Sequence, residues 1–117
     1  MNNLNLTFYG GVGSVTGANF FLEIEQTKIL VDCGFLQGVV GSAEENAKPL
    51  PYNPADIDFL FITHAHMDHI GRVPKLVRDG FAGVIYSTNQ TRELAEIMFE
   101  DAVKVMAMNE RDGKGKA

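Results

Sequence analysis

All three histidines of this chain lie within six residues, directly after a predicted strand. Residues 59–63 form the run Phe-Leu-Phe-Ile-Thr, whose apolar and β-branched side chains are typical of a strand buried in a sheet. The run leads directly into residues 64–69, which read His-Ala-His-Met-Asp-His. The sequence therefore predicts a cluster of imidazole and carboxylate groups in the loop at the end of a buried strand.

Imidazole and carboxylate groups at this spacing are typical metal ligands. Residues at positions i and i+2 after a strand point to one side, so His64 and His66 can face one metal ion. The turn that follows lets Asp68 and His69 face a neighbouring site. Zinc suits these donors, with manganese or iron as alternatives, and an open coordination position lowers the pKa of a bound water to about 7. The alternative, polar loop residues without a ligand, is disfavoured by three histidines around one aspartate.

Residues upstream of the cluster predict further strands. Residues 4–9 and 20–25 alternate apolar and polar side chains, which is the pattern of half-buried strands. A polar turn joins the second of them to the apolar run 29–31, so we expect a hairpin whose second strand is buried on both faces and closes on Asp32. Glycines and prolines predict a long loop over residues 34–54, although residues 42–45 could form one short helical turn.

Residues after the cluster predict two helices with a strand between them. Pro74 in a first turn and Gly80 after a last turn predict a short helix over residues 73–79, and residues 83–86 form a short strand. Ser87 or Thr88 can cap a second helix that runs to about residue 108. Its predicted apolar stripe comprises Leu94, Ile97, Met98, Ala102 and Val105.

Composition narrows the class of protein. A length of 117 residues predicts a single domain, and a net charge of −5 excludes the strong positive field of a non-specific nucleic-acid binder. Cys33 is the single cysteine, so no disulfide can form within the chain, which fits a reducing, cytoplasmic setting. We expect neither a signal peptide nor a membrane span, because no long apolar run occurs.

Three motifs in fixed order resemble a known family. The segment from His64 to Gly71 is similar to the HxHxDH signature of the metallo-β-lactamase superfamily. Together with the glycine-rich segment 10–17 and the segment 30–38 around Asp32, it resembles the β-CASP RNA nucleases, and within them the mRNA 3′-end cleavage factor branch and its prokaryotic homologues. The resemblance implies an α/β fold of the αββα four-layer sandwich type, of which this chain supplies roughly the first half, a mixed sheet with flanking helices.

The resemblance also implies roles for individual residues. His64 and His66 bind a first metal ion, and Asp68 and His69 bind a second. Asp68 also positions the attacking water, and Asp32 orients the site without binding metal, so both are predicted catalytic residues. The alternative for Asp32 is a strand-terminal aspartate that bonds nearby backbone.

The resemblance further implies ligands that this sequence does not contain. No histidine follows His69, and the family needs further histidines, a bridging aspartate and an inserted lobe that clamps RNA. We therefore expect residues 1–110 to be the N-terminal part of a larger metal-dependent nuclease and residues 111–117 to be a flexible tail. The isolated chain is expected to have an incomplete ligand set and no turnover. Its exposed sheet face is expected to favour dimerisation or other association.

The implied reaction is hydrolysis of phosphodiester bonds in RNA by a metal-bound hydroxide. One alternative is a hydrolase of thioesters or small esters on the same fold, because the metal motif is shared. The other is a non-catalytic fragment that binds a partner.

Two further features leave a functional and a structural interpretation open. The loop over residues 10–17 can present backbone N–H groups to a phosphate, or its glycines can serve a tight strand connection. The basic residues Arg72, Lys75 and Arg78 can bind an RNA backbone or be ordinary solvated residues.

Overall fold

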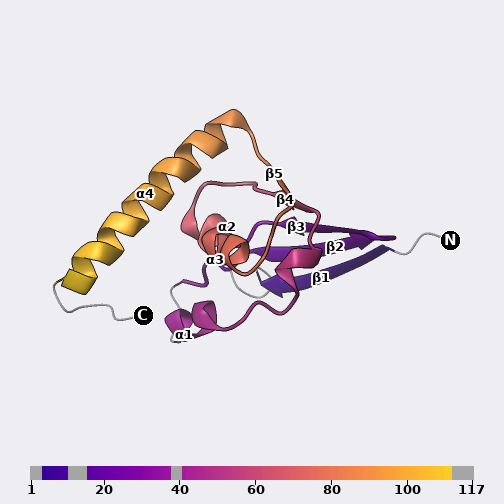
Figure 1. Cartoon of the computed structure of the whole chain (residues 1–117), viewed down its shortest axis with the longest axis horizontal. Helices are drawn as coiled ribbons and strands as arrows, with labels where there is room; N and C mark the ends of the chain where they lie inside the picture. The colour runs from indigo at the N-terminus through magenta and orange to yellow at the C-terminus, as the bar shows by residue number, and fades with distance from the viewer. Residues whose placement is uncertain (1–3, 11–15, 38–40, 112–117) are drawn as a thin grey trace.

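The sheet of this protein has five strands in sequence order. The computed structural model describes residues 4–10, 16–37 and 41–111. The strands are β1 (Leu4–Gly10), β2 (Asn19–Ile24), β3 (Thr27–Val31), β4 (Phe59–Phe61) and β5 (Val84–Tyr86). The pairs β1–β2 and β2–β3 are antiparallel, and β3–β4 and β4–β5 are parallel. A mixed sheet with helices was the expectation from sequence, and it is confirmed (Figure 1).

The helical segments lie between β3 and β4, between β4 and β5, and after β5. They are α1 (Ser42–Ala47), the 3-10 turn η1 (Pro54–Asp56), α2 (Met67–Ile70), α3 (Val73–Arg78) and α4 (Asn89–Arg111). The expectation of a loop over residues 34–54 is therefore wrong at α1, where Glu44 and Glu45 lie in the first turn and favour a helix there. Thr88 caps α4, because its Oγ1 accepts a hydrogen bond from the Thr91 N–H at 3.1 Å. Gly80 follows α3 with φ +122°, a backbone conformation that glycine adopts most readily. The predicted helix starts and stops at these residues are confirmed.

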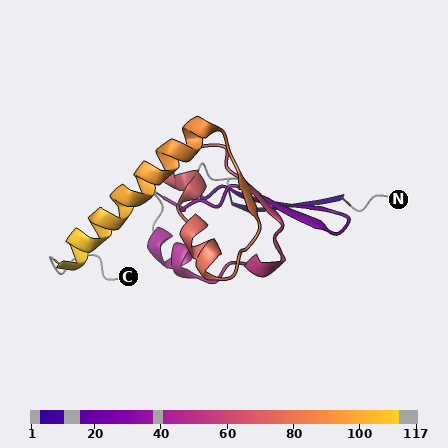
Figure 2. The same cartoon turned by 45° about the horizontal axis from the view of Figure 1, so that its top comes forward.

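One face of the sheet packs against α2 and α3. The buried core joins Phe21, Leu30 and Leu60 of the strands to Ile70 and Leu76 of these helices. Leu30, Leu60, Ile70 and Leu76 are fully buried, so this side forms the hydrophobic core of the described chain. Figure 2 shows the short helices gathered beside the sheet, with the long helix α4 running away from them.

The other face of the sheet is apolar and open. Strand register places Leu6, Leu22, Ile29, Phe59 and Val84 in one row across the sheet. Leu6 is 53% exposed and Val84 50% exposed. The expectation that residues 29–31 are buried on both faces is therefore wrong, because only Leu30 points into the core while its neighbours face the open side.

The long helix α4 contacts the core through a stripe that shares only Met98 with the described part of the predicted one, and the side chains of Ala102 and Val105 lie outside the described residues. Ala95 is buried, and Met98 and Phe99 pack against the core. Leu94 and Ile97, which were assigned to the buried stripe, are 54% and 61% exposed. The apolar positions of this helix span more than one face, and packing selects the face that meets α3 and the sheet. The helix then extends diagonally away from the sheet (Figure 1). No helix in the described part of the chain is long and apolar enough to cross a membrane.

Candidate metal centre

The predicted site residues lie at one edge of the sheet. Asp32 follows β3, and His64 follows β4 after a connection of two residues. These strands are parallel neighbours, with Val31 paired to Phe61, so their carboxyl ends meet. Crevices outside the carboxyl ends of neighbouring parallel strands are common ligand sites in α/β proteins.

The four predicted metal ligands form a connected group. The rings of His64 and His66 are nearly parallel, at 17°, with centroids 6.4 Å apart. The ring of His69 lies 4.7 Å from that of His64, and its Nε2 is 3.5 Å from Asp68 Oδ2. His64 and His66 are exposed, whereas the side chains of Asp68 and His69 are about a quarter exposed. The group can therefore be reached from solvent on its histidine side.

Asp32 connects this group to the buried part of the protein. Its side chain is 2% exposed, and its Oδ2 lies 2.8 Å from Nδ1 of His69. Its Oδ1 accepts the Thr63 backbone N–H at 2.8 Å. Asp32 has φ +61°, a left-handed conformation that aspartate tolerates better than most residues. Both sequence interpretations of Asp32 therefore have a counterpart, since its carboxylate contacts a predicted ligand and a nearby backbone group.

The short helix α2 is fixed to two other segments by backbone hydrogen bonds. The carbonyl of Met67 accepts from Phe35, that of Asp68 from Ala18, and that of His69 from Cys33, at 2.8, 3.1 and 2.8 Å. A Cβ on Gly34 would come within 1.7 Å of the Asp68 carbonyl oxygen. Only glycine permits this approach, so Gly34 lets the segment after β3 hold Asp68 and His69 in place.

A buried polar network lies beneath Asp32. Asn19 is fully buried, and its Nδ2 donates to the Asp32 carbonyl at 2.9 Å. Its Oδ1 accepts from the Tyr52 hydroxyl at 3.0 Å, and that hydroxyl lies 3.9 Å from the Cys33 thiol. Burial raises the pKa of the Cys33 thiol and that of the Tyr52 phenol. This network holds the backbone of Asp32 at the point where it takes its left-handed conformation.

The basic residues in α3 and directly before it form hydrogen bonds or ion pairs with other residues of the chain. The Arg72 Nε donates to the Gly34 carbonyl, and the Lys75 Nζ donates to the carbonyls of Asn46 and Lys48. Arg78 pairs with Asp79 at 2.9 Å. The structural interpretation of these cations is favoured, since Arg72 and Lys75 join α3 to the segments after β3 and after α1.

The donor types of the group fit a divalent metal ion, but the described donors do not surround one common point. Imidazole nitrogen and carboxylate oxygen are the donors that zinc and manganese accept. Among the described residues, no three histidine, cysteine, aspartate or glutamate side chains are arranged around a common point. The described residues thus bring these donors together in pairs.

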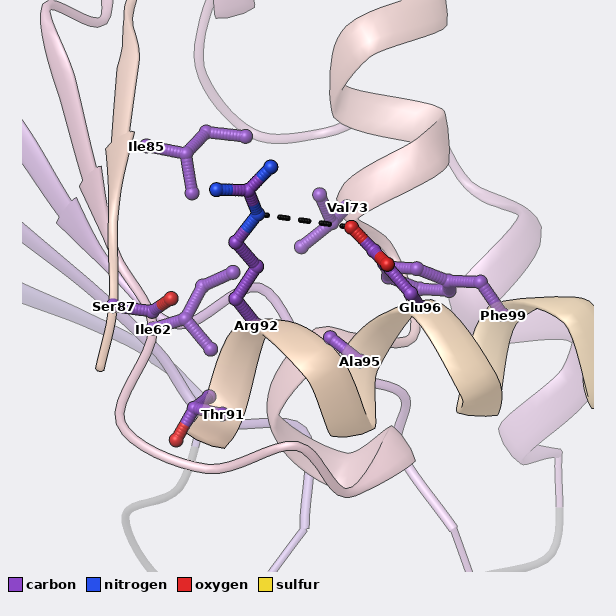
Figure 3. Close-up of a pocket in the computed structure, with 9 residues that line it drawn as sticks. All are labelled: Ile62, Val73, Ile85, Ser87, Thr91, Arg92, Ala95, Glu96 and Phe99. Carbon is purple, nitrogen blue, oxygen red and sulfur yellow. Dashed lines mark ion pairs between the residues drawn. The ribbon is translucent and has the colours of Figure 1, made fainter. Parts of the chain in front are cut away.

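A separate cavity of about 310 Å³ lies between β5 and the first turns of α4 (Figure 3). Its wall is mainly apolar and includes Ile62, Ile85 and Phe99, and the Arg92–Glu96 ion pair, at 3.7 Å, lies beside it. None of the three histidines lines it.

Comparison with known proteins identifies the family. A family model described as the metallo-beta-lactamase superfamily matches residues 13–106. The chain belongs to this superfamily. Membership implies binding of divalent metal ions, which agrees with the donors at the candidate centre.

The relatives within the superfamily have names from RNA metabolism. The chain is 42% identical over 98 residues to "Ribonuclease TTHA0252" of Thermus thermophilus, covering 84% of this chain and 22% of that protein. It is 34% identical over 101 residues to "Cleavage and polyadenylation specificity factor 73" of Drosophila melanogaster, covering 81% of this chain and 14% of that one. The chain thus spans about a fifth or less of these relatives. The resemblance to the mRNA 3′-end cleavage branch and its prokaryotic homologues is confirmed.

A solved structure supports the superfamily fold. The short form of human tRNase Z matches with a TM-score of 0.51 and 24% identity, covering 87% of this chain and 40% of that one. The predicted fold class is therefore confirmed, with this chain covering part of the fold.

Sequence reasoning missed three residues of the site. Thr63 contacts Asp32 through its backbone and its hydroxyl, and Asn19 and Tyr52 form the network beneath. Two signals were available in the sequence. Thr63 is a hydroxyl residue directly before His64, and Asn19 is an amide residue at the start of a largely apolar strand. The segment 11–15 of the glycine-rich loop lies outside the described residues, so its predicted anion site stays a prediction, and the same holds for the tail after residue 111.

Proposed function

We propose that this chain supplies the metal-binding part of a β-CASP nuclease that cleaves RNA. The observation that supports this most is the group of His64, His66, Asp68 and His69 at a strand end, with buried Asp32 hydrogen-bonded to His69. The names of the relatives favour RNA as the substrate. In this proposal residues 1–110 correspond to the N-terminal part of the metallo-β-lactamase domain.

The ligand roles follow the pairing of donors. His64 and His66, whose rings are nearly parallel, would hold one ion through one nitrogen each, and Asp68 and His69 would hold the second. Zinc is the proposed metal at both positions, with manganese as the alternative, because imidazole and carboxylate suit both. When bound, such ions supply Lewis-acid activation of water and stabilise charge on a phosphate.

Asp68 and Asp32 would act through different contacts. Asp68 is partly exposed, so its carboxylate can accept a hydrogen bond from the attacking water and orient it toward a phosphorus atom. Asp32 is buried and its carboxylate contacts Nδ1 of His69, so it would act by holding this ligand.

Metal content tests the ligand assignment. The chain is purified without chelator, and zinc and manganese are measured for the wild type, for His66→Ala and for the matched surface control Glu93→Ala. We expect metal in the wild type and in Glu93→Ala and a loss of it in His66→Ala. Equal metal content in all three would contradict the proposed ligands.

The RNA substrate needs a test in a complete protein. Residues 1–110 can replace the matching segment of the Thermus ribonuclease, to which the chain is 42% identical. We expect the chimera to cleave an RNA oligonucleotide and the same chimera with His66→Ala to lose cleavage. A chimera that folds, binds zinc and hydrolyses a thioester but not RNA would instead support the small-ester hydrolase.

The open sheet face favours a further role in association. Leu4, Leu6 and Phe8 of β1 are each more than half exposed and share one face with Val84. We propose that a second apolar sheet packs here, and that in the isolated chain two copies pair through this face. Sedimentation should show dimers that Leu6→Lys dissociates and that the matched control Val77→Lys, on α3, leaves intact. A monomer at all concentrations would contradict pairing.

A cytoplasmic setting is the proposed location. Cys33 is buried and is the single cysteine of the chain, so no disulfide can form within this chain in an oxidising compartment. Fractionation of cells that express the natural protein would test this location.

A further inference from the structure

The hydroxyl group of Thr63 lies between Asp32 and two predicted ligands. Its Oγ1 is 2.5 Å from Asp32 Oδ2, 3.1 Å from Nδ1 of His64 and 3.4 Å from Nδ1 of His69. A threonine hydroxyl has one hydrogen to donate and can accept at its lone pairs. Because the hydroxyl has one hydrogen, it can donate to one of these three atoms and has to accept from the others.

The first contact uses the only hydrogen of the Thr63 hydroxyl. An ionised carboxylate accepts hydrogen bonds and cannot donate, so Thr63 donates to Asp32. The distance of 2.5 Å is within the range of a charge-assisted O–H···O⁻ bond. The hydroxyl oxygen can then only accept from His64, so the Nδ1 of His64 has to carry a hydrogen.

The same reasoning applies directly to His69. Its Nδ1 is 2.8 Å from Asp32 Oδ2, which can only accept, so this nitrogen also carries a hydrogen. The contact of His69 with Thr63 is longer, at 3.4 Å, so Asp32 is its main partner. His64 has no contact of this kind with Asp32 and depends on Thr63.

We propose that Thr63 is a positioning residue that extends the acceptor role of Asp32 to His64. One buried carboxylate then fixes a hydrogen on Nδ1 of two imidazoles, and in the neutral tautomer this leaves the hydrogen off Nε2. The Asp68 carboxylate lies 3.5 Å from Nε2 of His69, farther than Asp32 lies from Nδ1 of the same ring. Neutral histidine binds a metal through the nitrogen without hydrogen, and a hydrogen bond at the other nitrogen selects it. The inference rests on the proposed function only in taking these Nε2 atoms as ligands.

His66 provides an internal control. No side-chain hydrogen bond of His66 is formed with the described residues, and its ring is exposed. Its tautomer is therefore not imposed by Asp32 or Thr63. A difference between His66 and the other two histidines separates an effect of this network from a general property of the loop.

The tautomers can be measured without metal or activity. The chain contains three histidines, so a long-range ¹H–¹⁵N spectrum of ¹⁵N-histidine-labelled, metal-free protein gives one pattern for each. The shifts of the two ring nitrogens distinguish the two neutral tautomers from each other and from the imidazolium form. We expect His64 and His69 in the Nδ1–H form. For His66 we expect a mixture of the two tautomers, because neither Asp32 nor Thr63 contacts its ring. A wild-type His64 in the Nε2–H form would overturn the proposal without any variant.

Two variants then isolate the hydroxyl group. Thr63→Val removes it and retains the β-branched shape, and Thr63→Ser retains it. We expect Thr63→Val to release the tautomer of His64 while His69 keeps its own through Asp32, and Thr63→Ser to keep both. If Thr63→Val fails to fold, the wild type and Thr63→Ser still decide, because both must show the Nδ1–H form at His64. An unchanged His64 in folded Thr63→Val would refute the role of Thr63.

Zinc titration separates this inference from the proposed function. Loss of a residue that orients a ligand typically lowers metal affinity by about 10-fold or more, so we expect this loss in Thr63→Val and not in Thr63→Ser. If the tautomers are as proposed and the wild type binds no zinc, the positioning role stands and the ligand assignment fails. If zinc binds equally to all three proteins while His64 lacks the Nδ1–H form, the positioning role fails and the ligand assignment stands.

Discussion

Replacement of Asn19 by leucine tests whether the buried amide holds the base of the candidate centre. Asn19 is fully buried and makes two hydrogen bonds, to the Asp32 carbonyl at 2.9 Å and from the Tyr52 hydroxyl at 3.0 Å. Leucine is similar in size and cannot form either bond. Two polar groups would be left without these partners, and at about 1–3 kcal/mol each the expected loss of stability is about 2–6 kcal/mol.

A double-mutant cycle isolates the hydrogen bond between the two side chains. Tyr52→Phe removes one bond and leaves the Asn19 oxygen without its donor, so we expect a loss of about 1–3 kcal/mol. In Asn19→Leu the Tyr52 hydroxyl has already lost this partner, so adding Tyr52→Phe costs less there. The coupling free energy between residues in one network is expected at about 0.5–3 kcal/mol.

Urea unfolding at 25 °C, followed by circular dichroism, gives these free energies for the wild type, both single variants and the double variant. Asn19→Leu should lower the unfolding midpoint without changing the slope with urea. A loss of less than about 0.5 kcal/mol, the size of an ordinary surface substitution, would refute the reasoning. Purely additive effects would show that the Asn19–Tyr52 hydrogen bond contributes nothing.

Two further predictions concern the same region. Gly34→Ala places a Cβ 1.7 Å from the Asp68 carbonyl oxygen, so it should lower the free energy of unfolding by more than about 2 kcal/mol in urea, whereas Gly41→Ala, with nothing within 4 Å, should cost only about 1 kcal/mol for its positive φ. Burial raises the pKa of Cys33 and of Tyr52, so on alkaline titration the unfolded chain loses these protons first. Stability should therefore be unaffected by these groups below about pH 8 and should fall as pH rises above about 9, with a smaller fall in Tyr52→Phe; a flat profile in the wild type would contradict this.

Local periodicity in the sequence was sufficient to predict most elements. Alternating residues predicted β1 and β2, and Thr88 and Gly80 marked the ends of helices because capping depends on near neighbours. The same reasoning failed for α4, where Leu94 and Ile97 were assigned to the core and are exposed. The apolar residues of this helix lie on more than one of its faces, and packing against the rest of the protein decides which face is buried.

By itself, the sequence determined the chemical types at the candidate centre, because His64, His66, Asp68 and His69 are neighbours in the chain and share one loop. Only the tertiary structure decided what surrounds them. Asp32 meets His69 across 37 residues, and Tyr52 meets Asn19 across 33. These contacts arise where β3 and β4 end side by side, and strand pairing is a long-range event that no local pattern encodes. Hence the donors, and through the resemblance the orienting role of Asp32, could be predicted from sequence, whereas the partners in the orienting hydrogen bonds could not.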